Sequence, residues 1–292
     1  MSAARDTARD ARDAVASNRL WYHTMELAPG VVTPGWFDLR PMLERLPWPD
    51  VRGKRCLDVG TYDGQLAFEL ERRGASEVVA TDIADHELWD WPERLRSRGP
   101  DYLRQVAGPQ KGSGFEIARD ILGSSVERRM ISVYDLRPET IGTFDVVVCG
   151  SLMLHLRDPL RALAAIRSVC LERFLSIEQV QLSTSVLCPR RPVVFFDGLT
   201  TLVQWWLPNA AAHRRMVEAA GFDIEEDGRV HCEPFGVAHP PVGGSPRARL
   251  TSAAKRVLTG NDGVPHHAIR ARPAPVASSS AVEESYDGRD RR

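Results

Sequence analysis

The sequence predicts an α/β fold in which helices cover both faces of a doubly wound, seven-stranded sheet. Three observations predict it. An apolar run at residues 55–59 turns through two glycines into a helical pattern, other short apolar segments end in acids or small residues, and helical patterns alternate with them. The carboxyl ends of the parallel strands should then form one ligand-binding edge. A chain of 292 residues suffices for one such domain with tails.

Composition excludes several classes of protein. The formal net charge is −1, so no overall field attracts nucleic acid or a membrane surface. The five cysteines are scattered and form no Cys-x-x-Cys pair, which predicts neither a disulfide framework nor a metal site. No apolar run approaches the roughly 18 residues of a membrane span, and no signal peptide is visible. We therefore expect a cytoplasmic protein without a membrane partner, and the oligomeric state stays open.

The first 53 residues divide into two segments. Residues 1–17 repeat Arg-Asp pairs without an apolar stripe, which predicts a disordered tail. Residues 18–53 are aromatic and rich in turns, and they should form a cap over the carboxyl edge of the sheet, with one helix near 39–46. Trp21, Tyr22 and Trp36 are candidate substrate-binding residues because aromatic faces bind cations. Packing within the cap is the alternative role for these rings.

The first sheet strand leads into the most informative turn. Asp58 lies in the strand, Gly60 and Gly64 bound the turn, and Leu66 to Leu70 begin a helix that Gly74 ends. Glycines let a ligand approach the backbone, and a helix N-terminus favours anions. The dinucleotide fingerprint needs a glycine at the third position of the turn, where this chain has Tyr62, and this side chain is too bulky for a pyrophosphate to pack on the turn. The turn therefore predicts a nucleoside ligand without a pyrophosphate.

The next strands supply further acids. A second strand at 77–82 ends in Asp82, which lies 24 positions after Asp58 and suits a carboxylate that accepts both ribose hydroxyls. A third strand at 130–134 is expected to end at Asp135, and a fourth at 144–149 to end at Gly150 and Ser151. Between the second and third strands, residues 86–110 form a long connection whose two tryptophans argue against disorder.

The remaining elements complete the sheet. Asp158-Pro159 begins a helix, a fifth strand covers 174–178, and Pro208-Asn209 begins another helix that ends at Gly221. Strands are expected at 222–225 and 267–270. The domain should therefore span 54–272, behind the cap at 18–53, with a disordered tail at 273–292.

Asp58-x-Gly60-x-x-x-Gly64 followed by Asp82 resembles class I S-adenosylmethionine-dependent methyltransferases. The Trp-Tyr-His and Gly-Trp-Phe pattern of the cap resembles the tRNA uridine-34 carboxymethyltransferase-like family. These resemblances imply a Rossmann-like fold and S-adenosylmethionine as cofactor. Asp135 resembles the acid that accepts the adenine amino group, and a turn cap is its alternative role. The implied cofactor-binding residues are Asp58, Gly60, Thr61, Tyr62, Gly64, Asp82, Ile83, Asp135, Leu136, Gly150 and Ser151.

Two histidines are candidate catalytic bases. His155 follows the fourth strand, which faces the methyl group in this fold, and a histidine titrates near neutral pH. Its alternative role is a hydrogen bond to the backbone of the turn before Asp158. His23 in the cap is the competing base. Trp205, next to Trp206, is a further candidate for the substrate wall, with core packing again the alternative.

The sequence therefore predicts a methyltransferase that acts on an oxygen or nitrogen of a small molecule. One alternative is a tRNA wobble-uridine modifier, which the family resemblance implies. Its only support in charge is a basic stretch that contains Arg249, Lys255 and Arg256. A second alternative, from another class, is a partner protein that binds S-adenosylmethionine without catalysis.

Overall fold

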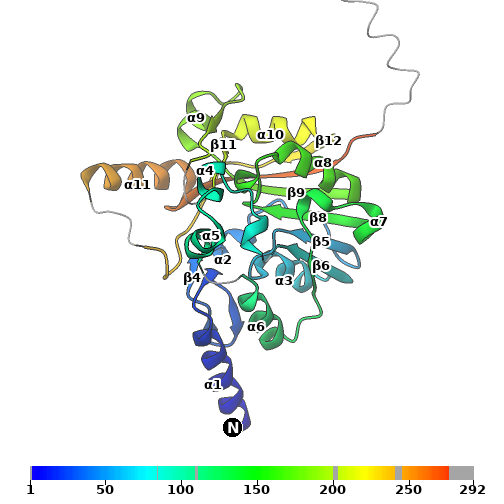
Figure 1. Cartoon of the computed structure of the whole chain (residues 1–292), viewed down its shortest axis with the longest axis vertical. Helices are drawn as coiled ribbons and strands as arrows, with labels where there is room; N and C mark the ends of the chain where they lie inside the picture. The colour runs from blue at the N-terminus through cyan, green and yellow to red at the C-terminus, as the bar shows by residue number, and fades with distance from the viewer. Residues whose placement is uncertain (1, 84, 109–110, 200–202, 241–244, 276–292) are drawn as a thin grey trace, which may run out of the picture.

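The structure is a computed structural model that describes residues 2–83, 85–108, 111–199, 203–240 and 245–275. Its centre is a mixed sheet whose main path holds seven strands (Figure 1). In their order across the sheet, these strands are β12 (Phe222–Asp227), β14 (Val264–Pro273), β9 (Cys170–Gln179), β8 (Phe144–Gly150), β5 (Arg55–Val59), β6 (Glu77–Asp82) and β7 (Glu127–Met130). A short strand, β13 (His231–Glu233), pairs with β14 off this path.

The five strands from β9 to β7 are parallel. β14 is antiparallel to both of its neighbours, β9 and β12, so β12 runs in the same direction as the five parallel strands. Alternate residues of the strands face two separate cores. Val146 and Val148 of β8 face α3 (Gln65–Arg72) and α6 (Ser113–Leu122). Val147 faces the opposite core, to which α7 (Pro138–Ile141), α8 (Pro159–Val169) and α10 (Ala210–Ala219) contribute. The doubly wound α/β prediction is therefore confirmed.

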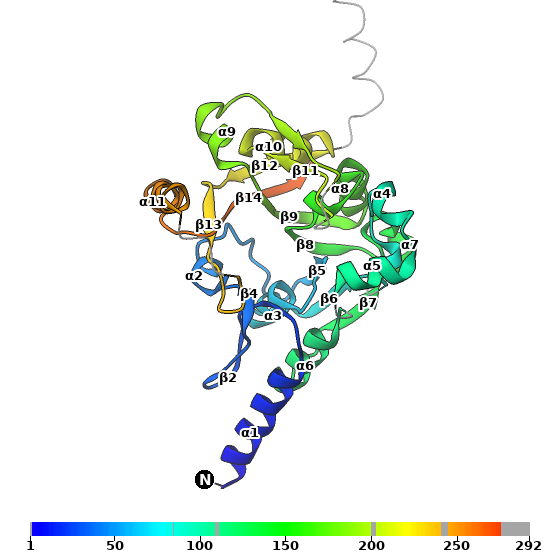
Figure 2. The same cartoon turned by 60° about the vertical axis from the view of Figure 1, so that its left-hand side comes forward.

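The segment at 18–53, which the sequence predicts as a cap, consists mainly of small strands. β1 (Trp21–His23) pairs with β4 (Gly35–Phe37), and β2 (Glu26–Ala28) pairs with β3 (Val31–Val32). The expected helix is α2 (Arg40–Leu43). A bridge from Phe37 to Phe235 joins the cap to the chain after β13, and Figure 2 shows β4 near β13. Gly236 is required there, because an added Cβ would lie 2.1 Å from the Gly35 carbonyl oxygen.

The prediction of a disordered tail at residues 1–17 is wrong. This segment is the helix α1 (Ser2–Ser17), which projects from the body in Figures 1 and 2. Ala11 and Val15 lie one turn apart and are buried in the same core as Trp21. The Trp21 indole Nε1 also donates to the Val15 carbonyl oxygen at 3.0 Å. Two small apolar side chains and one indole are enough to dock a helix that has no apolar stripe.

The long connection after β6 is partly helical. It contains η1 (His86–Leu88), α4 (Glu93–Arg96) and α5 (Pro100–Ala107). Trp91 is fully buried in a small core of its own with Leu95 and Leu103. Folding around that indole explains why the connection is ordered despite its length.

Other short elements complete the described chain: η2 (Val133–Asp135), η3 (Met153–His155), α9 (Leu182–Leu187), β10 (Val194–Phe196), β11 (Trp206–Pro208) and α11 (Pro246–Thr259). β14 covers the predicted last strand, and residues 276–292 of the predicted tail lie outside the described residues. Within the described part of the chain, no helix combines the length and apolar character that crossing a bilayer requires.

Candidate functional site

The turn after β5 has the conformation that its glycines predict. Gly60 and Gly64 have φ angles of 79° and 96°. At Gly64 an added Cβ would lie 2.3 Å from the Phe68 ring, so only glycine fits. Tyr62 also adopts a positive φ of 52°, which is strained for a residue with a bulky side chain. Such strain persists where surrounding contacts enforce it, and here the enforcing contact comes from Asp82.

Asp82 holds this turn from the end of β6. Its Oδ2 accepts the Tyr62 amide at 2.8 Å, and its Oδ1 accepts the Ile83 amide at 2.7 Å. Burial raises the pKa of the Asp82 carboxyl, and the two amides oppose that rise. Lys111, which donates to the Tyr62 hydroxyl at 2.6 Å, also opposes it through its charge. Asp82 is therefore a half-buried acceptor at the carboxyl end of β6.

Asp82 lines a hollow of about 410 Å³ that opens to solvent. The hollow follows the carboxyl ends of β5, β6 and β7. Its lining includes Val59, Gly60, Thr81, Ile83, Ser132, Val133 and Leu152. Of the predicted site residues, Gly60, Asp82 and Ile83 line this hollow, and they come from two separate segments.

Asp58 lies beneath the same turn and is 1% exposed. Its Oδ2 has no hydrogen-bond partner among the described residues. Burial raises the pKa of this carboxyl to about 6. Buried carboxylate oxygens are normally paired, so this one marks a place for a donor from outside the chain. An ammonium group meets that requirement.

Asp63, in the middle of the turn, was not predicted as a site residue. Its Oδ2 accepts the amides of Tyr22 and His23 at 2.8 and 3.0 Å, and its Oδ1 accepts the His23 Nδ1–H. Burial alone lowers the pKa of His23, but the Asp63 carboxylate outweighs it and the net pKa is raised. A raised pKa favours the protonated form of His23, which suits an ion pair better than a base. One side chain thus fastens the cap to the turn.

The placement of Asp135 and Leu136 contradicts the prediction that they bind adenine. β7 ends at Met130, several residues earlier than expected, and residues 133–135 form η2. The Asp135 side chain is 61% exposed and lies 3.8 Å from Arg137. Leu136 is buried in the core, and its amide is used within η2. Ser132 and Val133 occupy the hollow instead.

Gly150 is the last residue of β8, and Ser151 follows it beside the Gly60 turn. Ser151 has a positive φ of 50°. Leu152, which follows it, would lie 3.1 Å from a Cβ added at Gly60. The amides of Leu152 and Met153 are held by the Glu178 carboxylate, which Met153 reaches at 3.2 Å. Glu178 therefore fixes the backbone that carries Ser151.

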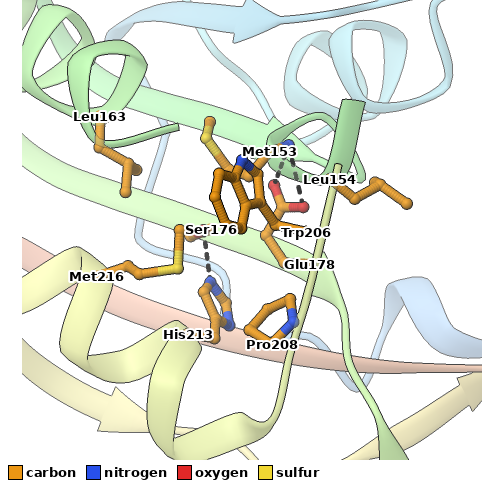
Figure 3. A pocket seen from close by; sticks show the side chains of 9 residues that line it. All are labelled: Met153, Leu154, Leu163, Ser176, Glu178, Trp206, Pro208, His213 and Met216. Carbon is orange, nitrogen blue, oxygen red and sulfur yellow. Dashed lines mark hydrogen bonds between the residues drawn. The ribbon is translucent and has the colours of Figure 1, made fainter. Parts of the chain in front are cut away.

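Glu178 also borders a second hollow of about 310 Å³ on the α10 side of β9 (Figure 3). Figure 3 shows its carboxylate directed at the backbone of η3, and His213 of α10 directed at Ser176. Burial raises the pKa of Glu178 to about 8. Met153, Leu163 and Met216 make the remaining wall largely apolar. The carboxylate that lines this hollow, Glu178, already has hydrogen-bond partners. The hollow is therefore a poorer site for a nucleoside than the one beside Asp82.

His155 and Trp205 both make contacts with the backbone. The His155 Nδ1 donates to the Val203 carbonyl oxygen at 3.0 Å, a backbone contact with a distant segment rather than with the turn before Asp158. The Trp205 indole Nε1 donates to the Asp90 carbonyl oxygen at 2.7 Å. These contacts favour the structural role for both side chains.

The cap aromatics divide between the core and the site. Trp21 is 1% exposed and packs on α1, so it cannot form a substrate wall. Tyr22, the next residue of β1, faces the opposite way. Its ring lies 5.0 Å from Tyr62 and 5.1 Å from Phe37. Trp36 contacts His239 edge-on at 5.8 Å. Tyr22 is therefore the cap ring that touches the cofactor turn.

Comparison with solved structures supports the fold. The N-terminal domain of EvdMO1, solved with S-adenosylhomocysteine bound, is 16% identical, with a TM-score of 0.51 over 92% of this chain and 97% of that one. YcgJ of Bacillus subtilis is 14% identical, with a TM-score of 0.50 over 82% of this chain and 98% of that one. At these identities the likeness concerns the fold alone.

Among proteins of known name, ubiquinone biosynthesis O-methyltransferases are similar. That of Neisseria meningitidis serogroup C (strain 053442) is 36% identical over 121 residues, which is 41% of this chain and 40% of the relative. That of Acinetobacter baylyi (strain ATCC 33305 / BD413 / ADP1) is 30% identical over 147 residues, 46% of this chain and 52% of the relative. The chain thus matches about half the length of these relatives.

A protein family described as a methyltransferase domain matches residues 38–227. That range runs from the end of β4 through β12. It includes the glycine turn, Asp82 and the whole parallel part of the sheet. Because the match covers well over half of the sequence, the chain belongs to the methyltransferase-domain family.

Proposed function

We propose that this protein transfers a methyl group from S-adenosylmethionine to an oxygen or nitrogen of a small molecule. The observation that carries the proposal is the pairing of the Asp82 carboxylate, which lines the hollow, with the buried Asp58 oxygen that has no partner among the described residues. Asp82 would accept the ribose hydroxyls, Asp58 would accept the ammonium group, and Ser132 and Val133 would lie along the adenine. The fit needs no metal.

When bound, S-adenosylmethionine supplies an activated methyl carbon on its sulfonium, so the chain's own task is to align the acceptor, exclude water and remove a proton. Ser151 and the backbone of η3, which Glu178 holds, would border the methyl group, and Tyr22 would cover it from the cap. The named O-methyltransferase relatives support a small acceptor, but each is matched over only part of its length.

Titration calorimetry tests the cofactor assignment directly. We expect S-adenosylmethionine and S-adenosylhomocysteine to bind and NAD to give no heat, because Tyr62 occupies the place of the pyrophosphate-binding glycine. Binding of NAD with similar affinity, or no binding of either sulfur nucleoside, would remove the proposal.

Labelled cofactor incubated with a metabolite extract and with total tRNA tests the acceptor. We expect label in the extract and little sensitivity to salt, because catalysis through phosphate contacts would weaken steeply as salt is added. A labelled uridine would favour the tRNA alternative, whose local support is α11, which carries Arg249, Lys255 and Arg256. Lys255 is already bonded to the Gly263 carbonyl oxygen at 2.7 Å. Binding without turnover on either material would favour a non-catalytic partner protein.

The same incubation tests the two predicted bases. We expect His155→Ala to lower labelling of the extract by less than about tenfold, since its Nδ1 serves the Val203 carbonyl and general bases contribute about 10² to 10⁴-fold. A loss of about a hundredfold or more, with cofactor affinity unchanged, would restore His155 as the base. His23→Ala is the matched variant, and we expect it to weaken the cap through the loss of its Asp63 pair.

A further inference from the structure

Ser151, His266 and Glu233 form a cluster of three side chains, and two of them, His266 and Glu233, have no role described so far. Ser151 Oγ lies 2.8 Å from His266 Nε2, and the same nitrogen lies 3.4 Å from Glu233 Oε2. The His266 and Glu233 side chains are 3% and 8% exposed. They come from the end of β8, from β14 and from β13, so strands far apart in sequence bring them together.

The hydrogen bonds of His266 define its tautomer. Its Nδ1 lies 2.9 Å from the Val264 carbonyl oxygen, which can only accept, so Nδ1 carries the hydrogen. In the neutral ring, Nε2 is then a lone pair that accepts from the Ser151 hydroxyl. Burial lowers the pKa of His266 to about 4, so the ring is neutral at physiological pH. The Nε2 lone pair is thus directed at the Ser151 hydroxyl.

The Glu233 carboxyl lies next to His266 Nε2, and it can gain or lose a proton near neutral pH. Burial raises its pKa to about 7, and the charges of His231 and His23 oppose that rise. The titratable groups that face it come from β1, β9, β13 and β14, namely Tyr22, His23, Glu178, His231 and His266. A positive charge brought to this edge would therefore favour the ionised carboxylate.

The cluster faces the same region as the cofactor turn. His23 experiences the charges of both Glu233 and Asp58. Ser151, with its strained backbone, lies one residue before Leu152, which contacts the Gly60 position. A ligand held by Asp82 and Asp58 would extend along this edge toward Ser151.

We propose that Ser151, His266 and Glu233 form the proton acceptor for methyl transfer to a hydroxyl group, with Glu233 as the counter-charge of the sulfonium. The proposal rests on the proposed function and narrows its acceptors to alcohols and phenols. The bond that forms joins the acceptor oxygen to the methyl carbon, and the bond that breaks joins that carbon to sulfur, leaving a neutral thioether.

The proton follows a defined route. The acceptor O–H proton passes to Ser151 Oγ while the Ser151 hydroxyl proton passes to His266 Nε2. The resulting imidazolium is stabilised by the Glu233 carboxylate and returns its proton to solvent after the product leaves. The positive charge that the sulfonium loses is thus the charge that His266 gains, and Ser151 ends each cycle unchanged.

Proton linkage tests the proposal without knowledge of the acceptor. Calorimetry of the full chain in phosphate and in Tris gives the protons released when each sulfur nucleoside binds. At pH 7 we expect S-adenosylmethionine to release up to about half a proton more than S-adenosylhomocysteine, because only its sulfonium ionises Glu233. Asp58 cancels from this difference, since both ligands carry the same ammonium group.

Glu233→Gln should abolish the difference while S-adenosylhomocysteine still binds. Glu225→Gln is the matched control, because Glu225 lies on β12 and pairs with Arg173, and it should retain the difference. Equal proton release by the two ligands, or a difference that persists in Glu233→Gln, would overturn the proposal. If that variant does not fold, the wild-type protein still decides. Its affinity for S-adenosylmethionine, divided by its affinity for S-adenosylhomocysteine, should rise between pH 6 and 8. A ratio that does not change with pH would contradict the proposal.

The relay itself is tested with the metabolite extract. Ser151→Ala should label it about 10² to 10⁴-fold more slowly than wild type, with the proton-release difference intact. A rate within a few-fold of wild type would refute the relay. Failure of both sulfur nucleosides to bind wild type is a distinct result, which would refute the proposed function itself.

Discussion

Replacing Asp63 with alanine should lower the free energy of unfolding by about 3–5 kcal/mol, the cost of removing one partner of a buried ion pair. Asp63 is 2% exposed and accepts the amides of Tyr22 and His23 as well as the His23 ring. Alanine would leave these three donors without an acceptor in a region closed to water. Urea unfolding followed by tryptophan fluorescence measures the loss.

Asp38→Ala is the matched control, because Asp38 forms a local pair with Arg40, whose side chain is 41% exposed. Its effect should be much smaller, as for other surface ion pairs. A loss at Asp63 no larger than that at Asp38 would mean that packing alone holds the cap. Asp63→Asn keeps an acceptor oxygen for the amides but no charge, and it should give an intermediate loss.

The ion pair between Asp63 and His23 also predicts how the free energy of unfolding depends on pH. Asp63 raises the pKa of His23 above its unfolded value of 6.5, so the pair's stabilisation is complete below that value and is lost as pH rises through the folded pKa. The stability difference between wild type and Asp63→Asn should therefore shrink from pH 6 to pH 9. A difference that grows over this range would contradict the assignment of a charged His23.

Asp82→Ala should weaken the binding of S-adenosylmethionine by about 1.5–3 kcal/mol, or roughly 10- to 150-fold, the scale of hydrogen bonds to a charged group. The variant loses the carboxylate that lines the hollow and also the acceptor that holds the Tyr62 amide in its strained conformation. Asp82→Asn should lose less, because it retains an acceptor for that amide. Calorimetry gives both values.

Asp135→Ala is the control for this measurement. It removes an acid that follows the neighbouring strand β7 but is exposed and does not line the hollow. We expect unchanged affinity. If Asp82→Ala binds S-adenosylmethionine as tightly as wild type, Asp82 does not bind the ribose. If Asp135→Ala binds it more weakly, Asp135 contacts the cofactor after all.

The sequence predicts those features of the fold and the site that depend on residues close together in the chain. The turn from Gly60 to Gly64 is fixed by backbone conformations that only glycine adopts readily, and Asp82 follows at a spacing set by one strand–helix–strand unit. The third strand was misplaced for a physical reason. β7 is at the edge of the sheet and carries Glu127 and Arg129, so its true residues lack the apolar run that marks an inner strand.

Contacts between distant segments could not be predicted in this way. Asp63 and His23 are 40 residues apart, and Ser151 and His266 are 115 apart. Nothing in the residues around His266 indicates that β14 lies against β9 and places that ring beside Ser151. The cofactor turn was therefore visible in the sequence, whereas the proposed proton acceptor emerged only from the pairing of strands.

The position of β14 has a consequence for biosynthesis. It is the last strand of the described chain, yet it lies between β9 and β12 rather than at an edge. While the ribosome is still making residues 264–273, β9 lacks its neighbour and β12 has no partner on the main sheet. A nascent chain must therefore keep two unpaired strand edges from aggregating until translation has passed β14, which makes early release by premature termination especially hazardous.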